Sequence, residues 1–594
     1  MPTPAPPAIH LVLHANRCFV NKARFSSQLP KKHIGVIYNM SWWRKSRFPD
    51  LKFPGIKLLQ STENNFIFYD KNHLAKQLIG LCLQVFLHKC TSSKYIRIAC
   101  ICTLGFMICW GAILVLAPIK PFWTDEWRLI YNIKFKSSSE LWGPLEYTQQ
   151  FPRVYLQFIK AITSHFDYSY FILRFPSFLI GTATIVFGYR LLNKIYTPDS
   201  RTRYLFILLI ISSFTFTEYF VQVKQYTMDI FLSLLAIWQL LELIKIDYGR
   251  FHIKWRYVFL CCSFLAAPYF SYTYPIAVSP VLILAFFRGL RLLKSNGDIK
   301  QKMGILFLQW FPLIIASLSI IVFYQIDVSG LMKDKEMYGY WNYRTISSGT
   351  GITNSIVKIW DFFAHVGSGL IFEIIIGVLG ICAVLRNVLW WIISRSKPKF
   401  DTNDILRSYS VLLIAITIVL FITGKLPVEP KFNLFALPSI AICIIFFLDD
   451  LLESASLKKF TLVTITVLYL GLIGNIFTTA INLFLLPEYS KRMKIFAATE
   501  NAIIQAQKRN LPIIVTPEVA YPDNIMEHVQ SLTLIPPAAV LKGFPAYEVS
   551  RNLPVYSAIN FNEINQIIKQ LSPADKAVIV GDGLLYRVVS LPEY

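Results

Sequence analysis

Two adjacent carboxylates, Asp125 and Glu126, stand between two tryptophans just after the first long apolar stretch of the chain. An ionisable group beside hydrocarbon is costly to desolvate, so such residues usually face a protein-lined, water-filled cavity and act on something there. A carboxylate in a covered cavity can serve as a general base, taking the proton of a hydroxyl group as its oxygen attacks. The alternative is a solvated loop whose Trp123 and Trp127 anchor it at the membrane surface.

Three further polar segments fall on the same side of the membrane in the topology given below: 218–229, 338–344 and 425–431. Their cations Lys224, Arg344 and Lys431 could neutralise an anionic leaving group such as a phosphate. Tyrosines and tryptophans offer stacking faces and hydroxyl groups suited to a sugar ring or an isoprenoid chain. Two alternatives stay open, a Lys224–Asp229 ion pair that caps a helix and an aromatic belt at 338–344.

The elements that must position these residues are membrane helices. The chain has 594 residues, of which 54% are hydrophobic and 16% charged, and its mean hydropathy of +0.47 is typical of a polytopic membrane protein. The net charge of +24 resides mainly in the N-terminal tail and in short loops between apolar segments. That distribution is a topology signal, and no nucleic-acid partner is predicted.

The predicted fold is an all-α bundle of eleven transmembrane helices within 96–485, and Lys94 and Arg97 place the N-terminus in the cytoplasm. An odd number of spans leaves the C-terminus extracytoplasmic. The tail 1–95 is expected to be basic, cytoplasmic and poorly ordered, resting on anionic membrane lipid, unless translation starts at Met40 or later. The predicted spans are 96–117, 170–192, 204–219, 226–244, 257–271, 275–290, 304–326, 368–392, 408–423, 432–449 and 460–485.

Two elements outside the spans are also predicted. Apolar residues recur at every fourth position from Val154 to Phe166 after Pro152, which predicts a short helix lying in the interface above the carboxylates. From residue 486 to 594 the composition changes to that of a small extracytoplasmic α/β domain. Its predicted strands are 511–515 and 577–580, and its predicted helices are 491–508 and 562–571.

Several motifs in one order resemble bacterial GT-C glycosyltransferases, the polytopic enzymes described as dolichyl-phosphate-mannose protein mannosyltransferase-like. The resemblance covers about residues 96 to 450. Its motifs are Thr124-Asp125-Glu126, Leu145-Glu146-Tyr147-Thr148-Gln149-Gln150-Phe151-Pro152, Leu173-Arg174-Phe175-Pro176-Ser177 with Gly181, Val223-Lys224-Gln225-Tyr226-Thr227-Met228-Asp229, and Pro430-Lys431-Phe432-Asn433-Leu434-Phe435-Ala436-Leu437-Pro438. Lysine stands at Lys431 where arginine is common, which keeps the charge and loses the bidentate fork.

The resemblance implies a GT-C-like fold and transfer of a hexosyl or pentosyl group from a polyprenyl-phosphate donor to a lipid, glycan or protein acceptor at the external face of the plasma membrane. It implies that Asp125 is the base, supported by Glu126, and that Lys431 contacts the donor phosphate. Lys224 and Arg344 are the further predicted phosphate ligands. The predicted substrate-binding residues are Glu146, Tyr147, Gln149, Tyr226, Asp229 and Trp341.

No cofactor or metal site is assigned from the sequence. Some relatives need a divalent metal and others do not, and no ligand cluster here decides between them. The alternative function is that of a transporter or flippase for a lipid-linked saccharide. Inverted repeats would favour it, and no convincing internal repeat is present.

Overall fold

The computed structural model describes most of the apolar part of the chain and four short strands near its end. The described residues are 93–116, 124–145, 149–166, 169–195, 202–246, 255–294, 299–329, 352–364, 370–394, 402–454, 456–485, 513–516, 555–557, 566, 569–570, 576–581 and 584–590. The N-terminal tail up to residue 92 and the aromatic loop with Trp341 and Arg344 therefore lie outside them.

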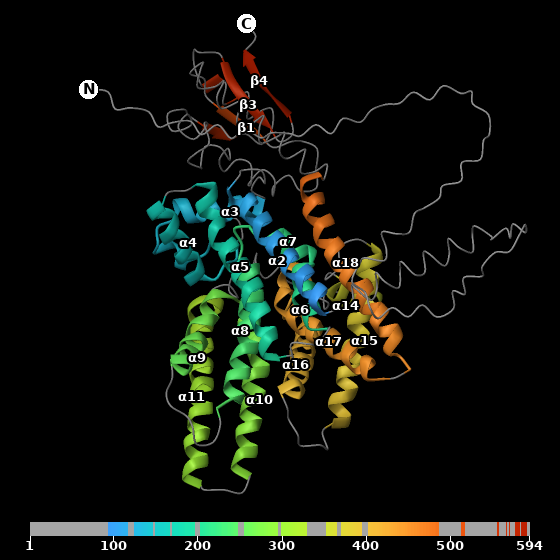
Figure 1. Cartoon of the computed structure of the whole chain (residues 1–594). Coiled ribbons are helices and arrows are strands. Elements are labelled where there is room, and N and C mark those ends of the chain that lie inside the picture. Colours follow the sequence, from blue (N-terminus) through green and yellow to red (C-terminus); the bar gives the residue numbers. More distant parts are fainter. Residues whose placement is uncertain are drawn as a thin grey trace, which may run out of the picture. The chain divides into compact units, whose positions relative to one another are not determined.

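Nine helical segments in the described part of the chain are long and apolar enough to cross a membrane, which makes the chain a multi-pass membrane protein. They correspond to nine of the predicted spans (Figure 1). Their helices are α2 (Ser93–Leu116), α5 (Tyr170–Ile195), α8 (Tyr226–Ile244), α10 (Tyr274–Lys294), α11 (Ile299–Phe323, extended by the π-helical turn η5, Tyr324–Val328), α15 (Leu370–Ser394), α16 (Thr402–Ile422), α17 (Leu437–Glu453) and α18 (Lys458–Leu485).

The outer faces of these helices are apolar, as a lipid environment requires. On α11, large exposed side chains recur with helical spacing at Phe307, Phe311, Ile314, Leu318 and Ile321. Exposing such a stripe to water would cost free energy, roughly 25 cal/mol for each Å² of apolar surface. Hydrocarbon removes that penalty, so the stripe marks a face of α11 that contacts lipid.

The other two predicted spans are divided into shorter pieces. The third consists of α6 (Arg203–Ile211) and α7 (Phe214–Tyr219), separated at Ser212 and Ser213, where the Ser213 hydroxyl accepts from the Phe216 N–H. The fifth consists of α9 (Trp255–Ala266) and the 3-10 turn η4 (Ala267–Phe270), where Pro268 cannot donate a helical hydrogen bond. The predicted count of eleven spans stays a prediction.

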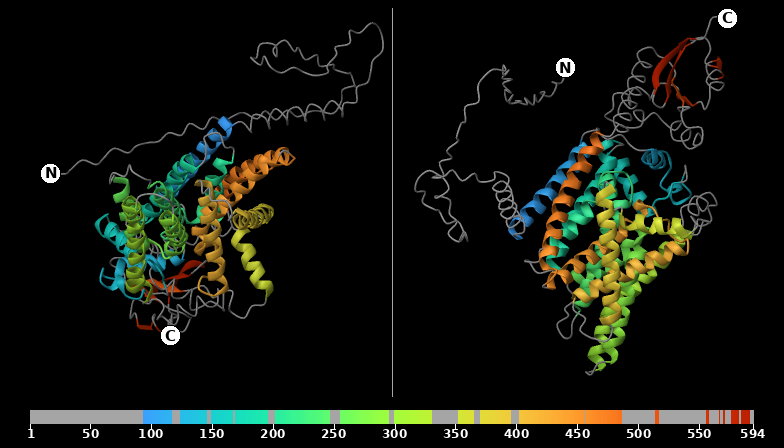
Figure 2. Two further views of the ribbon diagram at one scale, coloured as in Figure 1. Left: turned by 90° about the horizontal axis from the view of Figure 1, so that it is seen from below. Right: turned by 90° about the vertical axis from the view of Figure 1, so that its right-hand side faces the viewer.

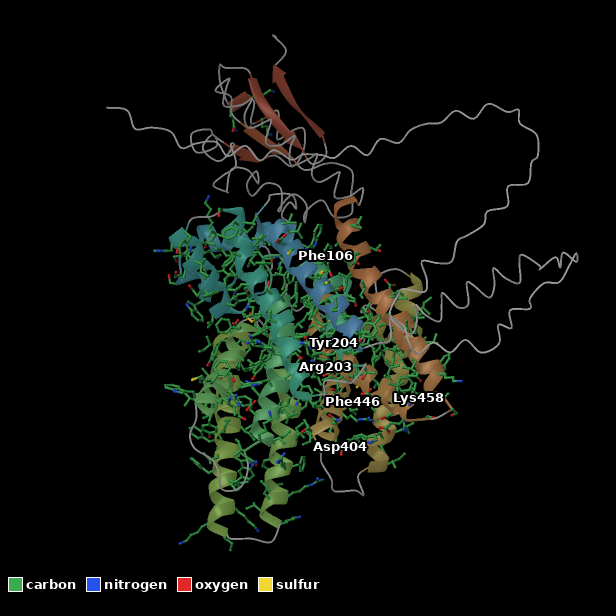
Figure 3. All side chains as sticks on the ribbon, viewed as in Figure 1. Phe106, Arg203, Tyr204, Asp404, Phe446 and Lys458 are labelled. Atoms are coloured by element: carbon green, nitrogen blue, oxygen red, sulfur yellow. The ribbon has the colours of Figure 1, made fainter. Side chains whose placement is uncertain are left out.

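The core of the helical part is formed by α6, α8 and α17. All nine residues of α6 are buried, including Arg203 and Tyr204, whose guanidinium carbon and ring centroid are 4.9 Å apart (Figure 3). Around this core, α2 and α18 run side by side (Figure 2), with the rings of Phe106 and Phe477 4.3 Å apart.

Short elements cover one end of the bundle. They are α3 (Thr124–Phe135), η2 (Glu140–Trp142) and α4 (Arg153–Phe166) after α2, and η6 (Pro430–Phe432) and η7 (Leu434–Ala436) before α17. A further helix, α14 (Ile352–Ala364), precedes and packs against α15.

The predicted amphipathic helix is confirmed as α4. Its predicted stripe faces outward, with Phe158 and Phe166 exposed, while Tyr155, Leu156 and Ile159 are buried on the other face. Two apolar faces suit a helix that lies between protein and lipid.

The C-terminal strands form one sheet in the order β2-β1-β3-β4. β1 (Ile513–Thr516) pairs in parallel with β2 (Val555–Ser557) and β3 (Lys576–Gly581), and β4 (Leu584–Ser590) pairs antiparallel with β3. β1 and β3 overlap the two predicted strands. The predicted helix 491–508 lies outside the described residues, as does most of 562–571, so the α/β domain as a whole stays a prediction.

Candidate functional site

Glu126, in the first turn of α3, joins three segments of the chain at one buried point. One of its carboxylate oxygens lies 3.3 Å from a guanidinium nitrogen of Arg174 on α5, and the other accepts a 2.8 Å hydrogen bond from the Val223 N–H. Both charged side chains are 0% exposed. A buried charge is tolerated only when it is paired and hydrogen-bonded, so this contact fixes α3 and the 220–225 segment against α5.

The aromatic ring of Phe220 packs between two glycines and so fixes the position of the 220–225 segment. The Phe220 side chain lies against Gly111 of α2 and Gly181 of α5, where an added Cβ would come within 2.1 and 2.5 Å of the ring. Only glycine allows so close an approach. The motif residue Gly181 thus positions the segment that carries Val223 and Lys224.

Lys224 contacts another predicted site residue. Its ammonium group donates a 2.9 Å hydrogen bond to the side-chain oxygen of Gln149, which stands just before α4. Lys224 and Gln149 are both buried. A buried cation is therefore held at the residue directly after Val223, whose N–H contacts Glu126.

Asp229, in the first turn of α8, is joined to the turn before α10. Its carboxylate accepts from the Ser271 hydroxyl, which also lies 3.0 Å from the Thr273 hydroxyl and accepts from the N–H groups of Thr273 and Tyr274. The helix dipole also favours an acid at this position. Asp229 thereby aligns the start of α8 with the start of α10.

The segment with Lys431 reaches the same region through aromatic rings. Tyr226 stands edge-on to Tyr219, with ring centroids 4.5 Å apart, and its centroid is 6.0 Å from that of Phe432. The Lys431 ammonium group lies 5.2 Å from the Phe432 ring and 3.5 Å from the Glu429 carboxylate. It is half-buried.

The structure thus brings six predicted residues to one end of the bundle, and the other five lie outside what it describes. The six are Glu126, Gln149, Lys224, Tyr226, Asp229 and Lys431. The backbone of Asp125 occupies the first turn of α3, but its side chain is outside the described part. Glu146, Tyr147, Trp341 and Arg344 are outside it entirely.

Sequence reasoning did not assign a site role to Arg174, nor to a second cluster close by. In that cluster the Asp327 carboxylate, at the end of α11, accepts from the Arg153 N–H at 2.8 Å and from the Tyr272 hydroxyl at 2.8 Å. The Tyr272 hydroxyl is also 2.9 Å from the Phe151 carbonyl oxygen. The signal that could have found Arg174 and Asp327 is a charged residue inside a long apolar run.

Burial, together with the charge of Asp327, raises the pKa of Tyr272 well above its ordinary value. Its hydroxyl therefore stays protonated and able to donate. Tyr272 and Asp327 together connect the start of α4 to the start of α10 and to the end of α11.

Polar atoms beside Tyr226 lack a hydrogen-bond partner within the part of the chain that the structure describes. They are the side-chain oxygens of Gln225 and Thr227, which flank Tyr226 in the sequence. Buried polar atoms in folded proteins are nearly always satisfied. Such atoms suit a site where a polar ligand supplies the missing partners.

Within the described residues, no three histidine, cysteine, aspartate or glutamate side chains gather closely enough to hold a metal ion. The side chain of Asp125 is outside that search.

Comparison with known proteins gives structural likenesses only. No protein-family model and no curated protein matches the chain. It is similar to the crystal structure of ArnT from Cupriavidus metallidurans bound to undecaprenyl phosphate, with 10% identity, a TM-score of 0.45, and coverage of 81% of this chain and 92% of ArnT. It is also similar to the oligosaccharyltransferase AglB from Archaeoglobus fulgidus in complex with an inhibitory peptide and a dolichol-phosphate. There the identity is 12%, the TM-score 0.38, and the coverage 73% of this chain and 63% of AglB.

Because both TM-scores are below 0.5, the function proposed below depends on the residues of the site.

Proposed function

We propose that the chain is a membrane glycosyltransferase that moves a sugar from a polyprenyl-phosphate donor to an acceptor at the external face of the plasma membrane. One observation carries the proposal. The Glu126 contact with Arg174 and Val223 holds the first turn of α3, which contains Asp125, beside the segment that carries the buried cation of Lys224. A base and a phosphate-binding cation on adjoining segments are the parts that transfer from a phosphate-linked sugar requires.

The roles follow from the position of each group. Asp125 acts as the general base that takes the acceptor hydroxyl proton. Glu126 is a positioning residue, because both of its oxygens are engaged by Arg174 and Val223. Lys224 and Lys431 neutralise the phosphate as it leaves, with Arg344 contributing from the aromatic loop. Glu146, Tyr147, Gln149, Tyr226, Asp229 and Trp341 shape the substrate site, and Gln225 and Thr227 offer further polar contacts to it.

Replacing Asp125 with asparagine tests the base directly. Asp125→Asn keeps the shape of the side chain and removes its basicity, so transfer should fall at least ~100-fold while the protein stays folded and inserted. The measurement is sugar transfer by purified protein supplied with lipid-linked sugars extracted from membranes. Transfer at the wild-type rate would overturn the assignment.

A comparison of membrane lipids from cells with and without the gene would identify the donor. A polyprenyl-phosphate sugar that accumulates without the gene names the sugar. If product linkages are normal and lipid-linked substrate is stranded in one leaflet, the chain is instead a transporter or flippase.

Replacing Lys224 tests the phosphate contact. Lys224→Gln removes the charge and keeps a polar group near Gln149, so the KM for the donor should rise roughly 10-fold or more, the usual weight of a charge-assisted contact. Lys431→Gln should have a smaller effect, because Lys431 is nearer to solvent and already lies 3.5 Å from Glu429. An unchanged donor KM in both variants would show that the donor phosphate does not bind at Lys224 and Lys431.

A further inference from the structure

A large cavity lies at the opposite end of the bundle from Glu126. It has a volume of about 790 Å³ and is bounded by the later turns of α8 and α10, the first turns of α16, Gln309 of α11, and Trp391 near the end of α15. Ligand cavities in proteins span roughly 300–1,000 Å³. Most of its wall is apolar, formed by leucine, isoleucine, phenylalanine and alanine side chains.

Three cations line one side of this cavity. Arg288, Arg291 and Lys294 follow one another at three-residue intervals on the last turns of α10, so they share one side of that helix. One nitrogen of Arg288 donates a 2.8 Å hydrogen bond to the Ile244 carbonyl at the end of α8, which anchors its guanidinium group at the cavity wall.

The side chains that line the cavity have a positive net charge. Among the described residues that line the cavity, none is acidic. Glu242, on α8 near this end, lies 3.7 Å from Lys245, which offsets its charge. The cavity therefore combines apolar walls with a cationic side, a pairing that fits an anionic amphiphile.

Apolar surface continues around α10. A groove of about 470 Å³ between α10 and α11 shares Ile283 and Phe287 with the cavity and is otherwise lined by residues such as Trp310 and Leu318. Two adjoining apolar spaces, separated by the side chains of one helix, suit a lipid with two acyl chains.

We propose that this cavity binds an anionic phospholipid from the leaflet at its end of the bundle. The lipid phosphate contacts Arg288, Arg291 and Lys294, one acyl chain enters the cavity, and the other follows the groove between α10 and α11. Basic pockets between membrane helices recognise lipid head groups in this way. A small soluble anion would leave the apolar walls unused. The proposal is independent of the transfer reaction, whose residues lie at the other end of α8 and α10.

Lipid retention by the purified full-length chain tests the proposal. Native mass spectrometry would compare phosphatidylglycerol with phosphatidylcholine of the same acyl chains. The wild-type protein should retain phosphatidylglycerol preferentially. The triple variant Arg288→Gln/Arg291→Gln/Lys294→Gln should lower that retention on the order of tenfold or more, with phosphatidylcholine unchanged.

A matched control removes three cations that do not line the cavity. The control variant is Arg256→Gln/Lys458→Gln/Lys459→Gln, whose three positions are exposed in the first turns of α9 and α18. Lys458 is toward the same end of the bundle as Asp404 (Figure 3). Retention of phosphatidylglycerol by the control variant should stay within about twofold of wild type. An equal loss in the control, or equal retention of both lipids by the wild type, would overturn the proposal.

A second variant tests the apolar part. Ala285→Phe places a ring in the cavity wall and should reduce retention of both lipids while the cations remain. Undiminished retention would exclude an acyl chain from the cavity. Competition with polyprenyl phosphate identifies the occupant. If polyprenyl phosphate displaces bound phosphatidylglycerol at a much lower concentration than free phosphatidylglycerol does, the cavity binds polyprenyl phosphate and the phospholipid assignment is wrong.

Discussion

Two arginine–carboxylate pairs stand at opposite ends of the helical part and differ in geometry. Arg174 meets Glu126 through one nitrogen at 3.3 Å, with both side chains fully buried. Two guanidinium nitrogens of Arg407 donate hydrogen bonds of 3.0 and 2.5 Å to the Asp450 carboxylate, and both side chains are partly exposed.

The surroundings of the two pairs differ as well. The Arg407 guanidinium lies 4.6 Å from the Phe446 ring and 5.1 Å from the Trp390 ring, and Arg386 also lies 3.5 Å from Asp450. Bidentate, stacked pairing of this kind is a strong way to fasten neighbouring helices. The Glu126 pair instead fastens α3 and the 220–225 segment, which both carry predicted site residues. One pair stabilises the bundle, and the other holds together segments of the candidate site.

Breaking the Glu126 pair should have the larger effect. Glu126→Gln leaves the charge of Arg174 uncompensated in a fully buried position, so the free energy of unfolding should fall by about 3–5 kcal/mol and transfer should be lost. Thermal unfolding in detergent micelles measures the first effect, and sugar transfer measures the second.

Two further variants separate charge from position. Glu140→Gln removes an exposed carboxylate from the same segment between α2 and α5 and should leave the unfolding temperature near that of wild type. The double variant Glu126→Gln/Arg174→Gln should recover much of the lost stability, because no unpaired charge remains. A single Glu126→Gln variant as stable as wild type would contradict a paired, buried Glu126.

Breaking the Arg407 pair should cost less and leave transfer intact. Arg407→Met keeps an apolar stem against Phe446, and Asp450 retains Arg386 and some solvent, so the loss should be about 1–3 kcal/mol. Arg386→Gln, whose side chain is 47% exposed, should cost about 0–1 kcal/mol. Turnover per folded molecule should match wild type in both. A fall in turnover would mean that this pair, too, positions the site.

The sequence predicted the membrane helices well because long apolar runs leave few alternatives. The predicted span 226–244 coincides with α8, and the period of Val154 and Phe158 located α4. Division of two spans was harder to foresee. The break between α6 and α7 depends on the Ser213 cap, which only local hydrogen bonding makes visible.

The pairing within the site was beyond sequence reasoning. The motif containing Arg174 was visible, but its contact with Glu126 joins residues 48 positions apart and depends on how α3 packs against α5. A Lys224–Asp229 ion pair was one alternative. The structure gives Lys224 a contact with Gln149 and Asp229 a contact with Ser271, a neutral residue that carries no charge signal.

A modest effect is expected at Tyr272, which links the start of α4 to the end of α11. Tyr272→Phe removes the hydroxyl shared between Asp327 and the Phe151 carbonyl, while Asp327 keeps its contacts with Arg153. The cost should be about 1–2 kcal/mol. Tyr269→Phe is the matched control, because the rings of Tyr269 and Tyr272 pack against Phe323 with nearly equal centroid distances of 5.9 and 5.8 Å. It should leave the unfolding temperature unchanged.

The pH dependence of this difference follows from the raised pKa of Tyr272. A group whose folded pKa is raised contributes stability fully below its unfolded pKa, about 10 for tyrosine, and loses that contribution as pH rises beyond it. The gap in stability between wild type and Tyr272→Phe should therefore be constant from about pH 6 to 9. A gap that closes within that range would mean that the hydroxyl ionises, which is incompatible with its burial beside the Asp327 carboxylate.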